Sequence, residues 1–218
     1  MQSWNAYTIW VATCGLGLLL ALAGEYRSNI GLGGFGKLVA ATSYIGAALS
    51  LGALDIDYGR IVLAAMAFCW IGDLLLVSKN RQLLFLAGLV SFLLGHLAYI
   101  GAFAVRGISI PALVVAAVVM AVFAWRVLAW LNPVLDQRMR KPVWLYVATI
   151  TAMMAMAVAT FSARGGLVVL IGGGLFVISD LTVARNRFVA PGFVNRAWGL
   201  PMYFSAQLLL AASVGMKA

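Results

Sequence analysis

Two aspartates and one histidine lie inside otherwise apolar stretches of this 218-residue chain. Asp73 lies in the run Phe-Cys-Trp-Ile-Gly-Asp-Leu-Leu-Leu-Val, and Asp180 lies in Leu-Phe-Val-Ile-Ser-Asp-Leu-Thr-Val. His96, in Leu-Leu-Gly-His-Leu-Ala-Tyr, is the only histidine of the chain. Carboxyl and imidazole groups are the side chains that most often give and take protons in catalysis. The set therefore predicts general acid–base chemistry or proton movement.

Other chemistries are excluded by the residue inventory. A single histidine cannot supply a three-histidine zinc site or bis-histidine haem ligation. The chain has no Gly-x-Ser-x-Gly elbow and no lysine in the middle of an apolar run that could carry a retinal Schiff base. Cys14 and Cys69 each lie in an apolar run, so we expect them to pack in the core without a disulfide. We expect neither a metal nor a cofactor.

The elements that carry these residues are apolar over lengths that cross a bilayer. Hydrophobic types make up 64% of the chain and charged types 10%, with a mean hydropathy of +1.03. A soluble fold of this length has no interior large enough to bury so much apolar surface. Long unbroken runs also exclude a barrel, whose strands alternate. The expected fold class is all-α, a polytopic membrane protein with eight transmembrane helices near 7–23, 38–54, 60–77, 83–105, 109–131, 143–161, 167–184 and 198–215.

The charges between the runs predict an orientation. The net charge is +9, but the basic residues lie in short connecting segments, which is the signal of membrane topology and argues against a nucleic-acid partner. The side of the termini holds four basic residues and the other side holds ten, so the second side is predicted to be cytoplasmic, with both termini outside a bacterial-type inner membrane. The start of the chain lacks the basic segment of a cleavable signal, so we expect the first run to stay as a helix. The four are Arg60, Arg106, Arg164 and Lys217; the ten are Arg27, Lys37, Lys79, Arg81, Arg138, Arg140, Lys141, Arg185, Arg187 and Arg196.

An internal offset of 107 residues carries Asp73 onto Asp180 and His96 onto Tyr203. This offset suggests that a single transmembrane domain, 1–218, consists of two four-helix halves, 1–107 and 108–218.

Both aspartates are predicted to lie roughly 7–9 Å inside the cytoplasmic boundary, at 1.5 Å per residue. A carboxylate in a span is costly and rare unless it has a function. The alternative is that each aspartate pairs with a basic residue and only locks helices together. The remaining acids are expected to be solvated loop charges, and the glycine-rich segment 31–36 is expected to belong to the first loop. These acids are Glu25, Asp55, Asp57 and Asp136.

Other polar residues in the spans are candidates for the same site. Tyr99 shares a helix face with His96 at i+3, and Tyr203 shares one with Gln207 at i+4. Interhelical hydrogen bonding is the alternative role for Tyr203 and Gln207, and the alternative for His96 is a packing position in which its hydrogen bonds are satisfied. Lys37 opens the second run, where it either binds an anion or anchors the helix by snorkelling.

The motifs that contain these residues resemble those of the YhhN-like family of membrane lysoplasmalogenases. Their order and spacing match from residue 37 to residue 207, although Leu38 stands where the family pattern has proline. The matching pieces are Lys37, Phe68-x4-Asp73, Phe85-x2-Gly88-x3-Phe92-x3-His96-x2-Tyr99-x3-Phe103, Phe176-Val-Ile-Ser-Asp180, Ala184-Arg-Asn-Arg-Phe188 and Tyr203-x2-Ala206-Gln207.

The resemblance implies a membrane hydrolase that cleaves the vinyl ether bond of lysoplasmalogens, a class of lysophospholipid, to a fatty aldehyde and a glycerophospho-headgroup. Asp73 and Asp180 would then be catalytic. The substrate-binding residues that it implies are His96, Tyr99, Tyr203, Gln207 and Lys37.

The implied reaction fits two carboxyl groups. Protonation of a vinyl ether carbon gives an oxocarbenium ion, to which water adds. One aspartate would supply the proton and the other would stay ionised, as in glycosidases, and the sequence leaves open which is which. Lys37, with Arg185 or Arg187, is expected to hold the phosphate, and the alkenyl tail is expected to lie against Phe92, Phe176 and Trp70.

Two other classes of function remain open. A small proton-coupled transporter uses the same buried carboxylates but moves protons without releasing aldehyde. A structural or lipid-binding protein would tolerate replacement of both aspartates.

Overall fold

The computed structural model describes residues 2–77 and 81–216, and their fold is all-helical, as the hydropathy predicts. A 3₁₀ turn, Asn132–Val134, follows α5, and a π-helical turn, Arg185–Val189, follows α7. The α-helices are α1 (Gln2–Tyr26), α2 (Ile30–Ser50), α3 (Asp57–Leu75), α4 (Gln82–Arg106), α5 (Ile110–Leu131), α6 (Gln137–Arg164), α7 (Leu167–Ala184) and α8 (Phe193–Ala212).

Among the described residues, seven helices, α1 to α7, are long and apolar enough to cross a membrane. Large apolar side chains cover their outer faces, for example Leu16, Val118 and Leu145. Such a continuous apolar exterior is stable only where lipid covers it. The protein is therefore a multi-pass membrane protein. Lys79 and Lys217, which were counted for the orientation, lie outside the described residues.

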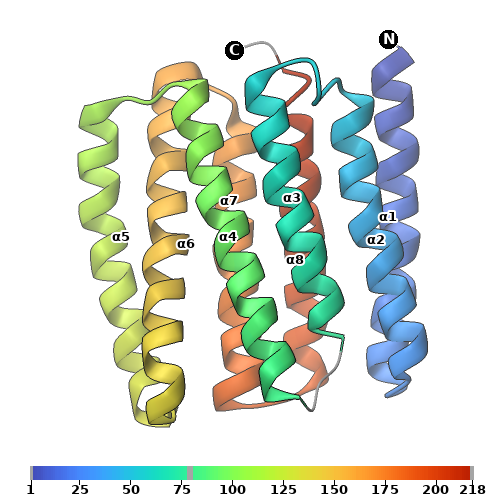
Figure 1. Cartoon of the computed structure of the whole chain (residues 1–218), viewed down its shortest axis with the longest axis vertical. Coiled ribbons are helices and arrows are strands. Elements are labelled where there is room, and N and C mark those ends of the chain that lie inside the picture. Colours follow the sequence, from blue (N-terminus) through green and yellow to red (C-terminus); the bar gives the residue numbers. More distant parts are fainter. Residues whose placement is uncertain (1, 78–80, 217–218) are drawn as a thin grey trace.

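The helices form a bundle in which elements that follow one another along the chain run in opposite directions (Figure 1). The helices pack most extensively in four pairs, α1 on α2, α3 on α4, α5 on α6 and α7 on α8; α4 also packs on α6, and α8 contacts α1 and α2. Helix α1 begins and α8 ends at the same end of the bundle, the upper end in Figure 1. The turns that follow α5 and α7 lie at the opposite end.

The expected glycine-rich first loop is wrong, because segment 31–36 is the start of α2. The side chain of Asn29 caps this helix by accepting the Leu32 N–H at 3.0 Å. The glycines lie where the backbones of α1 and α2 touch: a Cβ on Gly24 would lie 2.2 Å from the Gly33 nitrogen. Small residues are the usual means by which membrane helices approach this closely. The glycines therefore form a packing surface and not a turn.

This close packing buries an ion pair. Glu25 in α1 lies 3.2 Å from the Lys37 ammonium in α2, and the two side chains are only 7% and 6% exposed. The expectation that Glu25 is a solvated loop charge is therefore wrong. The other three loop acids, Asp55, Asp57 and Asp136, are exposed as expected.

Candidate active site

A pocket lies between α3, α4, α5, α6, α7 and α8, with Lys37 of α2 at its edge. It runs from the end of the bundle opposite the start of α1 toward the middle of the spans. Its empty volume, open mouth included, is about 1190 Å³, and most of its wall is apolar. Asp73 and Asp180 both line it. The structure thus brings the two aspartates, far apart in the sequence, to one cavity.

Asp73 receives hydrogen bonds from two tyrosines. The Tyr203 hydroxyl donates to its Oδ2 at 2.6 Å, and the Tyr44 hydroxyl donates to the same oxygen at 3.2 Å. Behind Tyr203, the Gln207 amide donates to the tyrosine oxygen at 3.3 Å. The Tyr99 hydroxyl donates to the Gln207 carbonyl oxygen at 2.6 Å. A buried chain of hydrogen bonds therefore runs from α4 through α8 to the carboxylate on α3.

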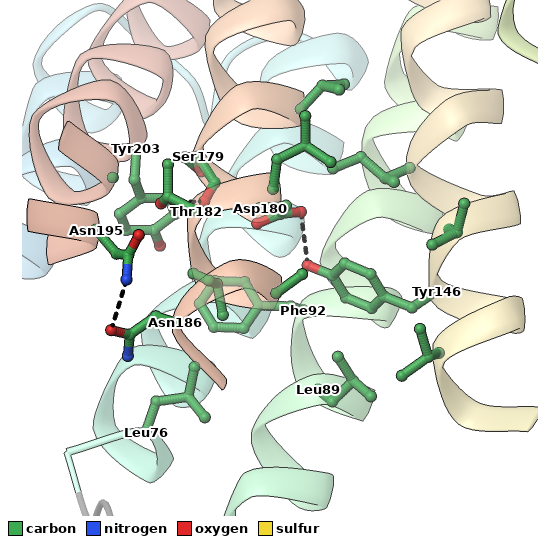
Figure 2. Close-up of a pocket in the computed structure, with 18 of the residues that line it drawn as sticks. Leu76, Leu89, Phe92, Tyr146, Ser179, Asp180, Thr182, Asn186, Asn195 and Tyr203 are labelled. Carbon is green, nitrogen blue, oxygen red and sulfur yellow. Dashed lines mark hydrogen bonds between the residues drawn. The ribbon is translucent and has the colours of Figure 1, made fainter. Parts of the chain in front are cut away.

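Asp180 has a different set of neighbours. The Tyr146 hydroxyl on α6 points at it across the pocket and donates to its Oδ2 at 2.8 Å (Figure 2). His96 Nε2 lies 3.6 Å from the same oxygen, beyond hydrogen-bond length. The other ring nitrogen, Nδ1, lies 2.7 Å from the Phe92 carbonyl oxygen one turn earlier. The imidazole is packed edge-on against the Phe176 and Tyr146 rings.

The predicted site residues divide into two layers. Lys37, Asp73, Asp180 and Tyr203 line the pocket. The other three are completely buried behind its wall: His96, Tyr99 and Gln207.

The residues expected along the lipid tail need a correction. Phe92 lines the pocket (Figure 2), but Phe176 and Trp70 do not. Phe176 packs against the His96 and Tyr203 rings, and the Trp70 indole donates to the Thr42 hydroxyl. These contacts turn both side chains away from the pocket, and the linear sequence does not show them.

Polar groups line the pocket where α7 is joined to α8. Asn186 and Asn195 line it, and the Asn195 amide donates to the Asn186 oxygen at 3.2 Å (Figure 2). Arg185 donates to Asn195, and the Arg187 guanidinium lies 4.4 Å above the Phe85 ring.

Two cations line the pocket, Arg196 in the first turn of α8 and the buried Lys37 of α2. The expected phosphate ligands Arg185 and Arg187 are not among the lining residues. Lys37 already pairs with Glu25, and Arg196 is the lining cation that the sequence analysis did not single out.

Tyr44 and Tyr146 were missed as well, because tyrosines in apolar runs are common and nothing in their spacing marks them. Glu25 was missed because glycine-rich segments are usually turns. Among residues 2–77 and 81–216, no three histidine, cysteine or acidic side chains come together to hold a metal ion.

The fold and the pocket define a polytopic helical membrane protein with two carboxyl groups in an apolar cavity that opens at one end of the bundle. The sequence model of the YhhN family matches residues 35–214, which is most of the chain. The protein therefore belongs to the YhhN family, which confirms the resemblance. No solved structure matches this chain.

The chain is also similar to curated mammalian proteins. Lysoplasmalogenase TMEM86A from Bos taurus is 30% identical over 158 residues, and the Homo sapiens protein is 32% identical over the same length. Lysoplasmalogenase TMEM86B from Sus scrofa is 28% identical over 211 residues, or 94% of this chain and 84% of that protein. Against the TMEM86A proteins the match covers 70% of this chain and 64% of their length.

Proposed function

We propose that this protein is a membrane lysoplasmalogenase, which hydrolyses the vinyl ether bond of a lysophospholipid with one alkenyl chain. The products are a fatty aldehyde and a glycerophospho-headgroup. Support comes from membership of the YhhN family and from relatives that bear this name at 28% to 32% identity.

The observation that carries the proposal is that Asp73 and Asp180 line one apolar pocket. Vinyl ether hydrolysis needs a proton donor for the β-carbon and a negative charge for the oxocarbenium ion that results. Two carboxyl groups in different protonation states meet both needs, and glycosidases divide the same work in this way. Positioned acid–base catalysis contributes about 10²- to 10⁴-fold. In a cavity with few polar groups, the electrostatic stabilisation of the cation adds to this factor.

The lining also supports a placement for the substrate. The phosphate lies at the mouth, where the Arg196 guanidinium is the natural ligand, with Asn186 and Lys37 beside it. The alkenyl tail lies along the apolar wall, against residues such as Phe85 and Val147. With the headgroup at the mouth, the ether oxygen enters the cavity at the depth of the carboxylates.

The proposal includes a topology. All eight helices cross the membrane, α8 included, and both termini lie outside, so the pocket opens toward the cytoplasmic leaflet of a bacterial-type inner membrane. Segments 1–107 and 108–218 are then two halves of a single domain, each contributing one aspartate.

The test is aldehyde release by purified protein in detergent from a 1-alkenyl lysophospholipid. Asp73→Asn and Asp180→Asn should each lower release by at least about 10²-fold while the protein stays folded. Asp55→Asn, a matched change of an exposed acid at the other end of the bundle, should have no effect. Proton-coupled flux in liposomes without aldehyde would instead indicate a transporter and refute the proposal.

A further inference from the structure

The two aspartates differ in the groups that their oxygens face. Asp73 Oδ2 faces two O–H donors, Tyr203 at 2.6 Å and Tyr44 at 3.2 Å. Hydrogen bonds donated to a carboxylate stabilise its ionised form. Lys37, which is paired with Glu25, lies on the Asp73 side, because Lys37 and Asp73 also line a second pocket that Asp180 does not line. Asp73 is therefore surrounded by groups that suit a negative charge.

Asp180 faces one O–H donor, Tyr146, and one nitrogen, His96 Nε2. The contact of the other ring nitrogen shows whether Nε2 carries a hydrogen. His96 Nδ1 lies 2.7 Å from the Phe92 carbonyl oxygen, and a carbonyl oxygen only accepts. Nδ1 therefore carries a hydrogen, so that in neutral imidazole the lone pair is on Nε2. His96 is completely buried, and Nε2 has no hydrogen-bond partner among the described residues.

The polar atom in front of this nitrogen is Asp180 Oδ2, at 3.6 Å. An ionised carboxylate would place two acceptors opposite each other in a buried site, which is unfavourable for both. A single proton between them removes the conflict, and a movement of less than about 1 Å brings the pair to hydrogen-bond length. Among the residues that the structure describes, no imidazole nitrogen faces Asp73, since His96 is the single histidine and lies at Asp180.

We propose that Asp180 and His96 share one proton and that Asp180 is the general acid, whereas Asp73 is the carboxylate that stays ionised. The chemical roles rest on the proposed function, but the position of the proton does not. Asp180 lines the pocket in which the proposed function places the substrate, so it is the catalytic member of the pair. His96 lies behind the wall and acts through Asp180, which makes it a positioning residue.

The assignment gives a closed reaction cycle. Asp180 transfers its proton to the β-carbon, where the electron pair of the double bond forms the new C–H bond. The carbon bonded to the ether oxygen is left as an oxocarbenium ion. Asp73 takes a proton from water while the water oxygen bonds to that ion, giving a hemiacetal. The hemiacetal hydroxyl then returns a proton to Asp180, the bond to the glycerol oxygen breaks, and Asp73 protonates that oxygen. Aldehyde and alcohol leave, and both aspartates regain their starting states.

The position of the proton is testable without substrate. Because the chain has a single histidine, a ¹⁵N-histidine label reports His96 alone when the full-length protein is purified through a tag that lacks histidine. We expect Nδ1 to be protonated and the Nε2 resonance to move in Asp180→Asn but not in Asp73→Asn. The infrared spectrum of the wild-type protein should contain a neutral carboxyl C=O band that is lost in Asp180→Asn and kept in Asp73→Asn. If the shared proton resides on Nε2, the ¹⁵N spectrum should instead show a doubly protonated imidazole.

A neutral carboxyl band that belongs to Asp73, or a singly protonated imidazole with no neutral carboxyl at Asp180, would overturn the assignment. Thermal unfolding in detergent shows whether each asparagine variant has kept its fold. Where Asp180→Asn is unstable, the spectra of wild type and Asp73→Asn alone decide between the two aspartates.

The catalytic roles are tested by chemical rescue. Formate should restore aldehyde release to Asp73→Gly, because it replaces a missing anion, and it should not restore Asp180→Gly. The reverse pattern would overturn the roles.

His96→Asn should lower kcat by about 10- to 100-fold with KM unchanged, since it weakens one hydrogen bond to the acid. A wild-type kcat in this variant would also overturn the pairing. If the wild-type protein releases no aldehyde, the proposed function fails while the spectra still decide the proton's position.

Discussion

The contact between α1 and α2 gives a prediction whose size follows from the structure. Gly24→Ala places a Cβ 2.2 Å from the Gly33 nitrogen and 2.5 Å from its Cα. Both neighbours are backbone atoms, so no rotamer change relieves the overlap. The two helices must separate by roughly 1 Å, a form of overpacking that typically costs about 1–3 kcal/mol.

Gly15→Ala is the matched control. It lies in the same helix, and a Cβ there would meet nothing within 4 Å. Both substitutions gain about the same helix propensity, up to about 1 kcal/mol, so this gain cancels in the comparison. We expect Gly24→Ala to be less stable than Gly15→Ala by about 1–3 kcal/mol. The measurement is the free energy of unfolding in mixed micelles, with thermal unfolding as a second readout.

The same separation should affect the site. Glu25 follows Gly24 directly, so a shift of α1 lengthens the 3.2 Å contact between Glu25 and Lys37 and moves Lys37 at the edge of the pocket. We therefore expect a raised KM for the lysolipid in Gly24→Ala and a normal KM in Gly15→Ala. Equal stability of the two variants would refute the close packing of α1 on α2 and, with it, this account of how Lys37 is positioned.

Three further predictions concern charge and shape. Arg196→Gln should raise KM about 10- to 100-fold with little change in kcat, because a hydrogen bond to a charged group contributes about 1.5–3 kcal/mol; the exposed Arg140→Gln is the control, and an equal effect in steady-state kinetics would argue against a phosphate site at Arg196. Glu25→Gln should destabilise the protein by about 3–5 kcal/mol, because it leaves the buried Lys37 without its carboxylate partner, and an unchanged unfolding free energy would contradict this. Val147→Trp fills part of the apolar wall, so activity on long alkenyl chains should fall before activity on short ones; a wild-type chain-length profile would mean that the tail lies elsewhere.

Much of the fold was predictable because it depends on properties of the linear chain. The apolar runs, their lengths and the absence of alternation specify helices that lipid must cover, since only helices satisfy their own backbone groups inside a bilayer. The run around Asp73 and the run around Asp180 both became helices for this reason. The boundary at 31–36 was predicted wrongly because glycine marks turns in water but close helix contacts in membranes.

The site was predictable only in part. Burying a carboxylate in an apolar span is costly enough to mark Asp73 and Asp180 as special from their surroundings alone. Their partners Tyr44 and Tyr146 were not predictable, because a tyrosine in a span has no such cost when any neighbour accepts its hydrogen bond.

The sequence by itself determined the class of protein, the all-helical architecture and the presence of two carboxyl groups within apolar helices. The tertiary structure alone decided that both carboxyl groups line one cavity and that His96 lies behind its wall against Asp180. It also decided that Tyr203 donates a hydrogen bond to Asp73, whereas Tyr146 donates one to Asp180. The physical reason is that the rotation of each helix about its own axis is not specified by its sequence. A helix that is apolar on every side has no amphipathic pattern that fixes which face turns inward. Each residue turns the side-chain direction by about 100°, so the partners of a buried polar group depend on how the helices pack.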